Sequence, residues 1–277
     1  MKRFIAALLA IFMVFSLTVS AFAEETATSD KLNYLLLGDS IAVGSGLLNP
    51  DDACYGRMVA NTNGYNYKND AVNGLMSGGL KNMVKTNAEV IEDIKNADII
   101  SISIGGNDFL QSDWFIPVIL SALVGYMGIE EEKIIKNFYP NFCEVIDTIK
   151  EINPDATILV QTLYNPRYVF LRATFARGVS ILNNCYYQYL EENPGAYTIV
   201  DVASALSNKV GFIAVDTVHP NSYGNKLIAK EILATLKELG LGENTEPVVN
   251  AQPVDEIAAP VYFPVQWLSQ LFSTVTA

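Results

Sequence analysis

A serine stands at the end of a strongly apolar run near position 40. Tyr34–Leu37 reads YLLL, which is typical of a fully buried strand, and GDS follows at Gly38–Ser40. Gly44 and Gly46 come shortly after. Glycines let a backbone turn sharply and let a ligand approach it closely. Ser40 is therefore either a turn residue or a nucleophile, and the rest of the sequence must show whether a base is available to it.

The chain contains a single histidine, His219, in the sequence DTVHPN. Asp216 precedes it by three residues, a spacing that brings two side chains together on a helical turn. A carboxylate bonded to the imidazole Nδ1–H fixes the tautomer, leaves Nε2 as a base, and stabilises the imidazolium that forms on protonation. The pair alone is a weak signal, because a histidine before Pro-Asn is also typical of a helix start or a surface position.

Two glycine-containing segments follow the next candidate strands. The first is VNGLMSGG at residues 72–79, and the second is IGGND at residues 104–108. The N–H of Gly78 and the side-chain amide of Asn107 are donors of the kind that stabilise a developing oxyanion. Gly74 is a second candidate for the glycine donor. Each segment taken alone also fits an ordinary turn.

Short apolar segments alternate with helical patterns, which indicates a parallel sheet covered by helices on both faces. The expected strands are Asn33–Leu37, Tyr65–Lys68, Asp98–Ile104, Thr157–Thr162 and Tyr197–Val200. The expected helices are Leu80–Asn96, Glu131–Ile152 with Pro140 as a break or kink, Arg172–Glu192, and Ser222–Leu239 between Asn221 as N-cap and Gly240 as a stop. In such sheets ligands bind at the carboxyl ends of the strands, and Ser40 follows the first of them.

The four segments together resemble the SGNH hydrolase family, also called GDSL lipases and esterases. GDS, NGLMSG, GGND and DTVHPN match the family's sequence blocks in order and span residues 38–221. The resemblance implies a flavodoxin-like three-layer α/β/α fold with a five-stranded parallel sheet. It also implies hydrolysis of carboxylic esters with no metal and no organic cofactor.

The resemblance assigns roles to individual residues. Ser40 is the nucleophile, and Asp216 and His219 complete the catalytic triad. The oxyanion hole consists of the N–H groups of Ser40 and Gly78 and the amide of Asn107. The reaction would pass through an acyl-enzyme, which water activated by His219 hydrolyses. Asp39 belongs to the GDS motif, and we interpret it as support for the loop and not as a second acid.

The substrate is less sharply indicated than the reaction. Phe109–Ile129 is apolar but interrupted by Pro117 and Gly125, so it is either a core helix with a loop or a wall of the acyl site. Within it we single out Trp114, Phe115 and Ile119 as candidate substrate-binding residues. A lipid-like or short-chain acyl ester fits this apolar segment. A carbohydrate O-acetylesterase is the alternative, and a non-catalytic surface-binding protein is a distant one.

The two ends of the chain have their own patterns. Lys2 and Arg3 precede an apolar run that ends in Ala21-Phe22-Ala23, which predicts a signal peptide cleaved after Ala23 and a secreted protein. An uncleaved membrane anchor is the alternative interpretation. The hydrolase domain is expected over residues 24–240. Residues 241–277 are expected to form a linker and a short amphipathic tail, for which membrane contact is a minor option.

The composition narrows the classes of partner. The formal net charge is −12, which repels phosphate backbones and argues against nucleic-acid binding. The three cysteines, Cys54, Cys143 and Cys185, are too few and too irregular for a disulfide framework. With a single histidine, the sequence also offers no Cys/His cluster with zinc spacing. A small-molecule or glycan ester is the expected partner.

Overall fold

Five parallel strands form the sheet that the sequence predicts. The computed structural model describes residues 31–111, 131–166, 172–207, 209–214 and 216–249. In these ranges the strands are β1 (Asn33–Gly38), β2 (Asn66–Asn69), β3 (Ile99–Ser103), β4 (Thr157–Gln161) and β5 (Thr198–Val200). Their order is β2-β1-β3-β4-β5. This is the doubly wound order of flavodoxin-like folds, so the expected fold class is confirmed.

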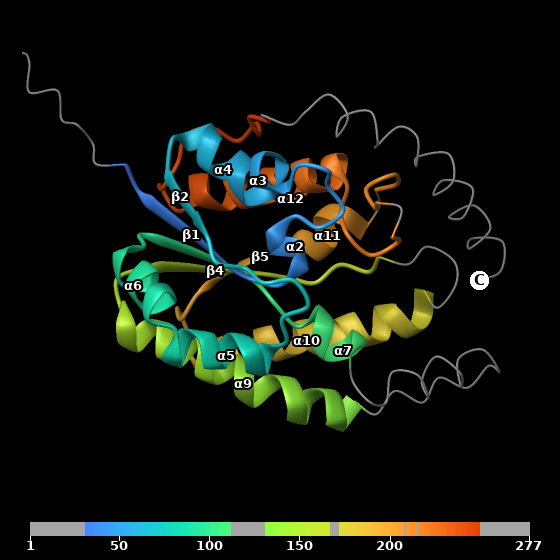
Figure 1. Ribbon diagram of the computed structural model, residues 1–277. Coiled ribbons are helices and arrows are strands. Elements are labelled where there is room, and N and C mark those ends of the chain that lie inside the picture. Colours follow the sequence, from blue (N-terminus) through green and yellow to red (C-terminus); the bar gives the residue numbers. More distant parts are fainter. Residues whose placement is uncertain (1–30, 112–130, 167–171, 208, 215, 250–277) are drawn as a thin grey trace, which may run out of the picture. The chain divides into compact units, whose positions relative to one another are not determined.

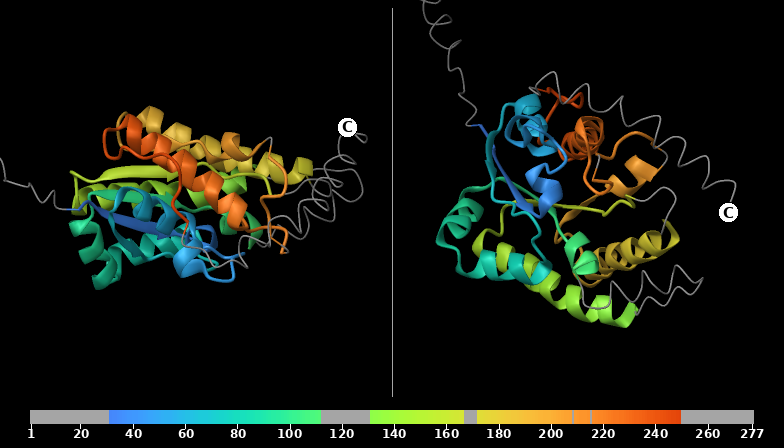
Figure 2. Two further views of the ribbon diagram at one scale, coloured as in Figure 1. Left: turned by 90° about the horizontal axis from the view of Figure 1, so that it is seen from above. Right: turned by 45° about the vertical axis from the view of Figure 1, so that its right-hand side comes forward.

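Helices cover both faces of the sheet (Figure 1). One face carries α5 (Ser77–Thr86), α6 (Ala88–Asn96), α9 (Glu131–Ile152) and α10 (Arg172–Glu192). The other carries α4 (Tyr55–Asn63), α11 (Val202–Ser207) and α12 (Ser222–Glu238). Three short helices, α2 (Ser40–Val43), α3 (Pro50–Ala53) and α7 (Gly106–Leu110), lie in the connections. The two further views in Figure 2 show the sheet between these two helical layers.

The alternation of side chains along each strand produces the two cores. In β1, Leu35 and Leu37 pack into the layer with α9, while Tyr34 and Leu36 pack into the layer with α12. All four side chains are at most 2 % exposed. Because successive side chains of a strand point to opposite faces, a strand covered on both sides must be apolar throughout. This accounts for the unbroken YLLL sequence.

The helix predicted over Leu80–Asn96 is two helices in the structure. Asn87 separates α5 from α6, and its side chain accepts hydrogen bonds from the N–H groups of Glu89 and Val90. An asparagine in this N-cap role ends one helix and begins the next. By contrast, Asn221 caps α12 as predicted, accepting from the N–H of Gly224. The helix α9 passes through Pro140 without ending there.

The helix α4, in the connection from β1 to β2, was not among the helices predicted from the sequence. Its buried residues Tyr55, Met58, Val59 and Thr62 have the i, i+3, i+4, i+7 spacing of an amphipathic helix. The polar residues between them obscured this spacing. The strand β2 also begins one residue later than predicted, at Asn66.

The described part of the predicted linker lies against the domain. The hydroxyl of Tyr65 donates to the carbonyl of Leu241 at 2.6 Å, and the N–H of Val248 donates to the hydroxyl of Thr62 at 2.8 Å. The Asn63 side chain donates to the carbonyl of Asn244 and accepts from its N–H. Side chains of α4 and of Tyr65 thus bond to backbone groups of this segment as far as Val248, while the predicted domain boundary at residue 241 stays a prediction.

Several predicted features lie outside the described residues. They are the signal peptide over 1–23, the candidate substrate-binding residues Trp114, Phe115 and Ile119, and the apolar tail. Within the described ranges, no helix has the length and apolar character that crossing a bilayer requires.

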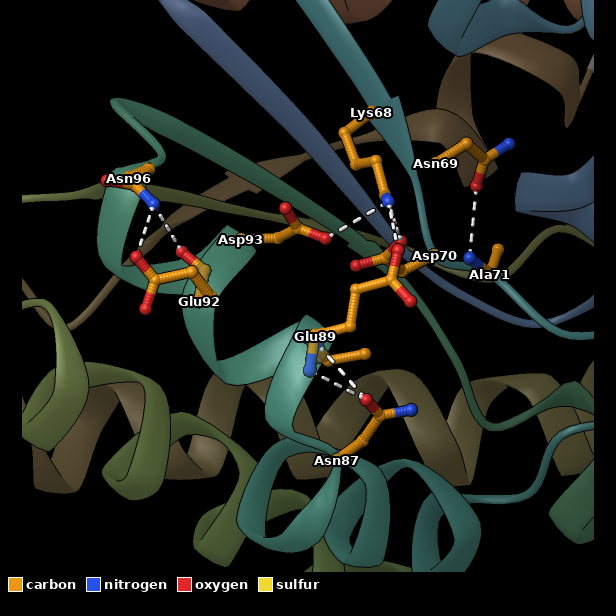
Figure 3. A network of polar contacts seen from close by, with 10 residues as sticks. Lys68, Asn69, Asp70, Ala71, Asn87, Glu89, Glu92, Asp93 and Asn96 are labelled. Atoms are coloured by element: carbon orange, nitrogen blue, oxygen red, sulfur yellow. Dashed lines mark hydrogen bonds and ion pairs between the residues drawn. The ribbon is translucent and has the colours of Figure 1, made fainter.

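A cluster of three carboxylates around Lys68 links the β2 segment to α6 (Figure 3). The Lys68 ammonium lies 2.7 Å from Glu89, 3.2 Å from Asp93 and 3.7 Å from Asp70. The side chain of Asp70 is 9 % exposed, whereas that of Glu89 is 74 % exposed. Burial, together with the negative charge of Asp93, raises the pKa of Asp70 from 3.8 to about 6, despite the opposing charge of Lys68.

This raised pKa predicts a pH-dependent effect of Asp70→Asn. The folded state binds the Asp70 proton more tightly than the unfolded state. The protonated carboxyl therefore stabilises the fold fully below pH 3.8, and this stabilisation is lost as the pH rises through about 6. Asparagine has no such loss. Urea denaturation should therefore show Asp70→Asn gaining stability relative to the wild type between pH 4.5 and pH 7.

Glu89→Gln is the matched control. Lys68 lowers the pKa of Glu89, so this carboxylate stabilises the fold above its ordinary pKa and loses that effect at lower pH. The glutamine variant should therefore show a small change of the opposite sign. A difference between Asp70→Asn and the wild type that stays constant with pH would contradict the prediction.

Candidate active site

The structure brings Ser40, His219 and Asp216 into one chain of hydrogen bonds. The Ser40 Oγ lies 2.8 Å from His219 Nε2, and His219 Nδ1 lies 2.7 Å from Asp216 Oδ2. The side chains of His219 and Asp216 are 21 % and 45 % exposed, so solvent reaches the site. The serine is 179 residues from the histidine in sequence. This is the geometry in which an imidazole can take a proton from a serine hydroxyl.

Ser40 is the first residue of α2, directly after β1. Asp39 caps this helix by accepting a hydrogen bond from the N–H of Ile41 at 3.0 Å. Asp39 is 1 % exposed, and burial raises its pKa to about 7. The residue thus supports the loop, in agreement with its interpretation from the sequence.

The glycines around Ser40 serve chain packing, which differs from the expectation that they clear space for a ligand. Gly38 has φ of 140°, and a Cβ on it would lie 2.0 Å from the carbonyl oxygen of Ser103 on β3. Gly46 has φ of 99°, and a Cβ there would lie 2.9 Å from the Cβ of His219. Side chains at either position would push the serine loop away from the strand or the histidine loop that it contacts.

The loop from Asp216 to His219 is held by its own carboxylate. Asp216 Oδ1 accepts from the N–H groups of Val218 at 2.9 Å and His219 at 3.0 Å. Burial alone would raise the pKa of Asp216, but these N–H groups and the imidazole outweigh it and hold the pKa below its ordinary value. Asp216 is therefore ionised at neutral pH and can stabilise an imidazolium.

Thr217 lies in the loop between Asp216 and His219. Among the described residues it is the single non-glycine residue with positive φ, at 67°. A β-branched residue rarely adopts this conformation, and such strain is common at functional sites. It is held by a hydrogen bond from the N–H of Thr217 to the carbonyl of Ala214. A second bond, from the Tyr164 hydroxyl to the carbonyl of Val218 at 2.7 Å, fixes the same loop from the segment that follows β4.

The three predicted oxyanion donors lie at helix starts. Ser40 is the first residue of α2, Gly78 the second of α5 and Asn107 the second of α7. The first N–H groups of a helix have no acceptor within it. In the described part of the chain the N–H groups of Ser40 and Gly78 have no hydrogen-bond acceptor. They are thus available to a ligand, although their role stays a prediction. Gly74, the rival of Gly78, lies in the turn before α5.

A glutamine that the sequence analysis missed holds the amide of Asn107. The Gln111 Nε2 donates to Asn107 Oδ1 and to the carbonyl of Gly74, both at 3.0 Å. The Asn107 Nδ2 donates to the carbonyl of Leu75 at 3.1 Å and keeps one hydrogen available. Gln111 and the carbonyl of Leu75 thereby set together which side of the amide carries the donor. The i, i+4 spacing from Asn107 is the signal that could have identified it.

Asp108 ties the starts of α5 and α7 together. Its carboxylate accepts from the N–H of Ser77 at 2.9 Å and from the Ser77 hydroxyl. Asp108 is 6 % exposed, and burial raises its pKa although both Ser77 bonds oppose the change. Because Ser77 directly precedes Gly78, this contact positions the glycine relative to Asn107.

A small apolar cavity of about 60 Å³ adjoins the serine. Its lining includes chain neighbours of three predicted site residues: Ile41 beside Ser40, Gly106 beside Asn107 and Val218 beside His219. Its walls include Phe109, Phe175, Val179 and Leu182, which are apolar. A larger and more polar cavity of about 440 Å³ lies farther along the same sheet edge, at the ends of β4 and β5.

The residues that could ligate a metal do not cluster in the described part of the chain. Cys54 and Cys185 are buried free thiols, and Cys143 is a half-buried one.

Comparison with known proteins identifies the family. The model of the GDSL-like lipase/acylhydrolase family matches residues 36–227. The chain belongs to this family. The predicted family and enzyme class, an SGNH/GDSL-type ester hydrolase, are thereby confirmed. The matched range contains every predicted site residue from Ser40 to His219.

Individual relatives share less than a third of their residues with this chain. A protein of Bacillus subtilis (strain 168), the uncharacterized protein YpmR, is 28 % identical over 231 residues, which are 79 % of this chain and 87 % of that protein. The lipase Lip_vut3 from a goat rumen metagenome is 22 % identical with a TM-score of 0.58, over 77 % of this chain and 99 % of that one. A mutant of Axe2, an acetyl-xylooligosaccharide esterase from Geobacillus stearmophilus, is 20 % identical with a TM-score of 0.55. The match covers 76 % of this chain and 94 % of that one. The two solved structures show that the fold is shared.

The contact between Asp108 and Ser77 predicts a loss of stability in Asp108→Asn. The amide group replaces one accepting oxygen by a donor, so the hydroxyl or the N–H of Ser77 loses its acceptor in a buried place. Leaving such a group unsatisfied costs about 1–3 kcal/mol, and we expect the free energy of unfolding to fall by that amount. Urea denaturation measures it.

Ser77→Ala provides the control, since it removes only the hydroxyl. The two changes act on one contact, so the double variant should be less destabilised than the sum of the single variants. Additive losses would show that Asp108 acts through other contacts.

Proposed function

We propose that the chain is an exported serine ester hydrolase that works through an acyl-enzyme. The observation that carries the proposal is the hydrogen-bond chain from Asp216 through His219 to Ser40. Family membership supports the ester-hydrolase chemistry, and the geometry supports the roles of these three residues. Export rests on the sequence of residues 1–23 alone.

The first half of the proposed reaction forms the acyl-enzyme. His219 Nε2 takes the proton of the Ser40 hydroxyl, and Oγ attacks the ester carbonyl. Asp216 stabilises the imidazolium through Nδ1. The N–H groups of Ser40 and Gly78 and the Asn107 amide bind the oxyanion, and His219 then gives the proton to the leaving alcohol. In the second half, water activated by His219 releases the acid by the same steps.

The apolar cavity beside Ser40 supports an acyl group as its occupant. It is lined by carbon-rich side chains and adjoins the neighbours of the nucleophile, the base and the amide donor. A fatty or short acyl chain gains from such burial, whereas a sugar hydroxyl would lose its hydrogen bonds to water there. The substrate is therefore a carboxylic ester with an apolar acyl part.

The carbohydrate O-acetylesterase alternative has one observation in its favour. The larger cavity at the ends of β4 and β5 is lined by polar groups that include Asp201, Asn184 and Ser204, with the exposed ring of Tyr187. Amides, carboxylates and aromatic rings are groups that bind sugars. An acetyl group would also fit the small apolar cavity, so the two candidates differ in the alcohol and not in the catalytic residues.

Ser40→Ala is the direct test of the nucleophile. Hydrolysis of p-nitrophenyl butanoate should fall by at least about 10³-fold, because the triad residues act as a unit. The rate for His219→Ala should fall about as far, and the rate for the double variant should be little lower than that for either single variant. Urea denaturation should show all three variants folded.

Covalent labelling provides the accompanying control. A fluorophosphonate probe should label the wild type and Ser45→Ala, in which a half-buried serine five residues after Ser40 is removed, but not Ser40→Ala. Labelling that persists without the Ser40 hydroxyl would show that another residue is the nucleophile.

The contact between Gln111 and Asn107 predicts a second kinetic effect. In Gln111→Glu the new carboxylate can only accept, so the Asn107 amide should turn its NH₂ toward residue 111 and its oxygen toward the oxyanion. Loss of one oxyanion donor lowers kcat by about 10²–10³-fold in the measured case, and we expect a fall of that order with little change in KM. Gln111→Lys keeps a donor at this place and should retain most of the activity. Equal rates for the two variants would show that Gln111 does not orient Asn107.

A further inference from the structure

The apolar cavity beside Ser40 is lined by deeply buried side chains. Val218 and Gly106 in its lining are chain neighbours of the predicted site residues, and Phe109, Phe175 and Leu182 in its lining are each at most 2 % exposed. An acyl chain bound in this cavity would therefore contact these three side chains.

Phe109 is held in this place by an unusual contact with α10. Its ring lies so close to Gly178 that a Cβ on the glycine would be 2.4 Å from one ring carbon and 2.7 Å from another. Phe175, about one turn earlier on the same helix, meets the Phe109 ring edge to face at 5.4 Å between centroids. The missing side chain of Gly178 thus lets the Phe109 ring pack directly against α10, where it forms part of the cavity lining.

We propose that Phe109 is the specificity-determining residue for the acyl chain, and that Gly178 sets how much of the cavity the Phe109 ring leaves open. This inference rests on the proposed ester hydrolysis at Ser40. It narrows the substrate class to esters of short acyl chains, because the open volume is small.

The volume of the cavity gives the expected length of the acyl chain. A cavity of about 150 Å³ in another protein accommodates the six carbons of benzene, so about 60 Å³ holds roughly two or three carbons beyond the carbonyl. Each methylene that is buried gains about 0.8 kcal/mol, or roughly fourfold in kcat/KM. We therefore expect kcat/KM to rise from acetate to butanoate and to fall for octanoate.

Phe109→Ala should lengthen the preferred chain. Removal of the ring extends the cavity toward α10, so the optimum in a series of p-nitrophenyl esters from acetate to decanoate should move by at least two carbons. The ratio of octanoate to butanoate in kcat/KM should rise at least tenfold. If this variant does not fold, Phe109→Leu, which removes less volume, should shift the optimum in the same direction by a smaller step.

Gly178→Ala should act in the opposite direction. The new methyl group displaces the Phe109 ring from α10 into the cavity, so kcat/KM for butanoate should fall at least fivefold while that for acetate changes less than twofold. Adding Phe109→Leu to Gly178→Ala should restore hydrolysis of butanoate, because the smaller side chain makes room for the methyl group. A structural defect in α10 would not be rescued in this way.

Phe142→Leu is the matched control for general loosening of the core. Phe142 is fully buried in the same layer, where it stacks on Phe138 outside the cavity lining. It should lower the melting temperature and leave the chain-length profile unchanged. Opposite shifts for Phe109→Ala and Gly178→Ala support the inference. Unchanged profiles in both, with Ser40 still required for hydrolysis, would overturn the inference alone, whereas a wild type that hydrolyses no ester in the series would overturn the proposed function with it.

Discussion

The parallel pairing of β1 with β3 is the constraint on which the candidate site depends. The two strands pair from Tyr34 with Ile99 to Gly38 with Ser103, so they end at the same level. Because both run in one direction, the residues that follow each strand emerge at one edge of the sheet. Ser40 and Asn107 therefore lie beside each other through backbone geometry alone. The absence of a side chain on Gly38 makes this close pairing sterically feasible.

Buried polar groups convert this proximity into a defined geometry. Asp39 and Asp108 each accept backbone N–H groups at a helix start, and each is buried at some electrostatic cost. The charge of Asp108 contributes to the raised pKa of Asp39, so the two carboxyl groups also destabilise each other's ionised forms. Asp216 is more exposed and better supplied with donors, and its pKa is lowered. The acid that contacts the histidine is thus the ionised one, while Asp39 serves the loop.

Local sequence signals predicted the parts of the fold that local interactions control. The apolar strands and the helices α9, α10 and α12 were predictable because burial on one or two faces imposes a period on their residues. The division of Leu80–Asn96 into two helices was not, since it depends on the Asn87 side chain turning back to its own backbone. The contacts of the segment after Gly240 were also not predictable, because its backbone bonds to Thr62 and Tyr65, which are distant in sequence. Polar composition indicates exposure only when no such contact forms.

The sequence by itself determined the reaction chemistry of the candidate site. A single histidine, an aspartate three residues before it and a serine after a buried strand leave few other arrangements, and their order matches the family. Tertiary structure decided everything that depends on distances between those segments. It placed Gln111 against Asn107, packed the glycines of the serine loop against β3 and the histidine loop, and set the Phe109 ring against Gly178 beside the small apolar cavity. Such contacts join residues whose types are ordinary in isolation. Their function arises only from how closely the folded chain brings them together.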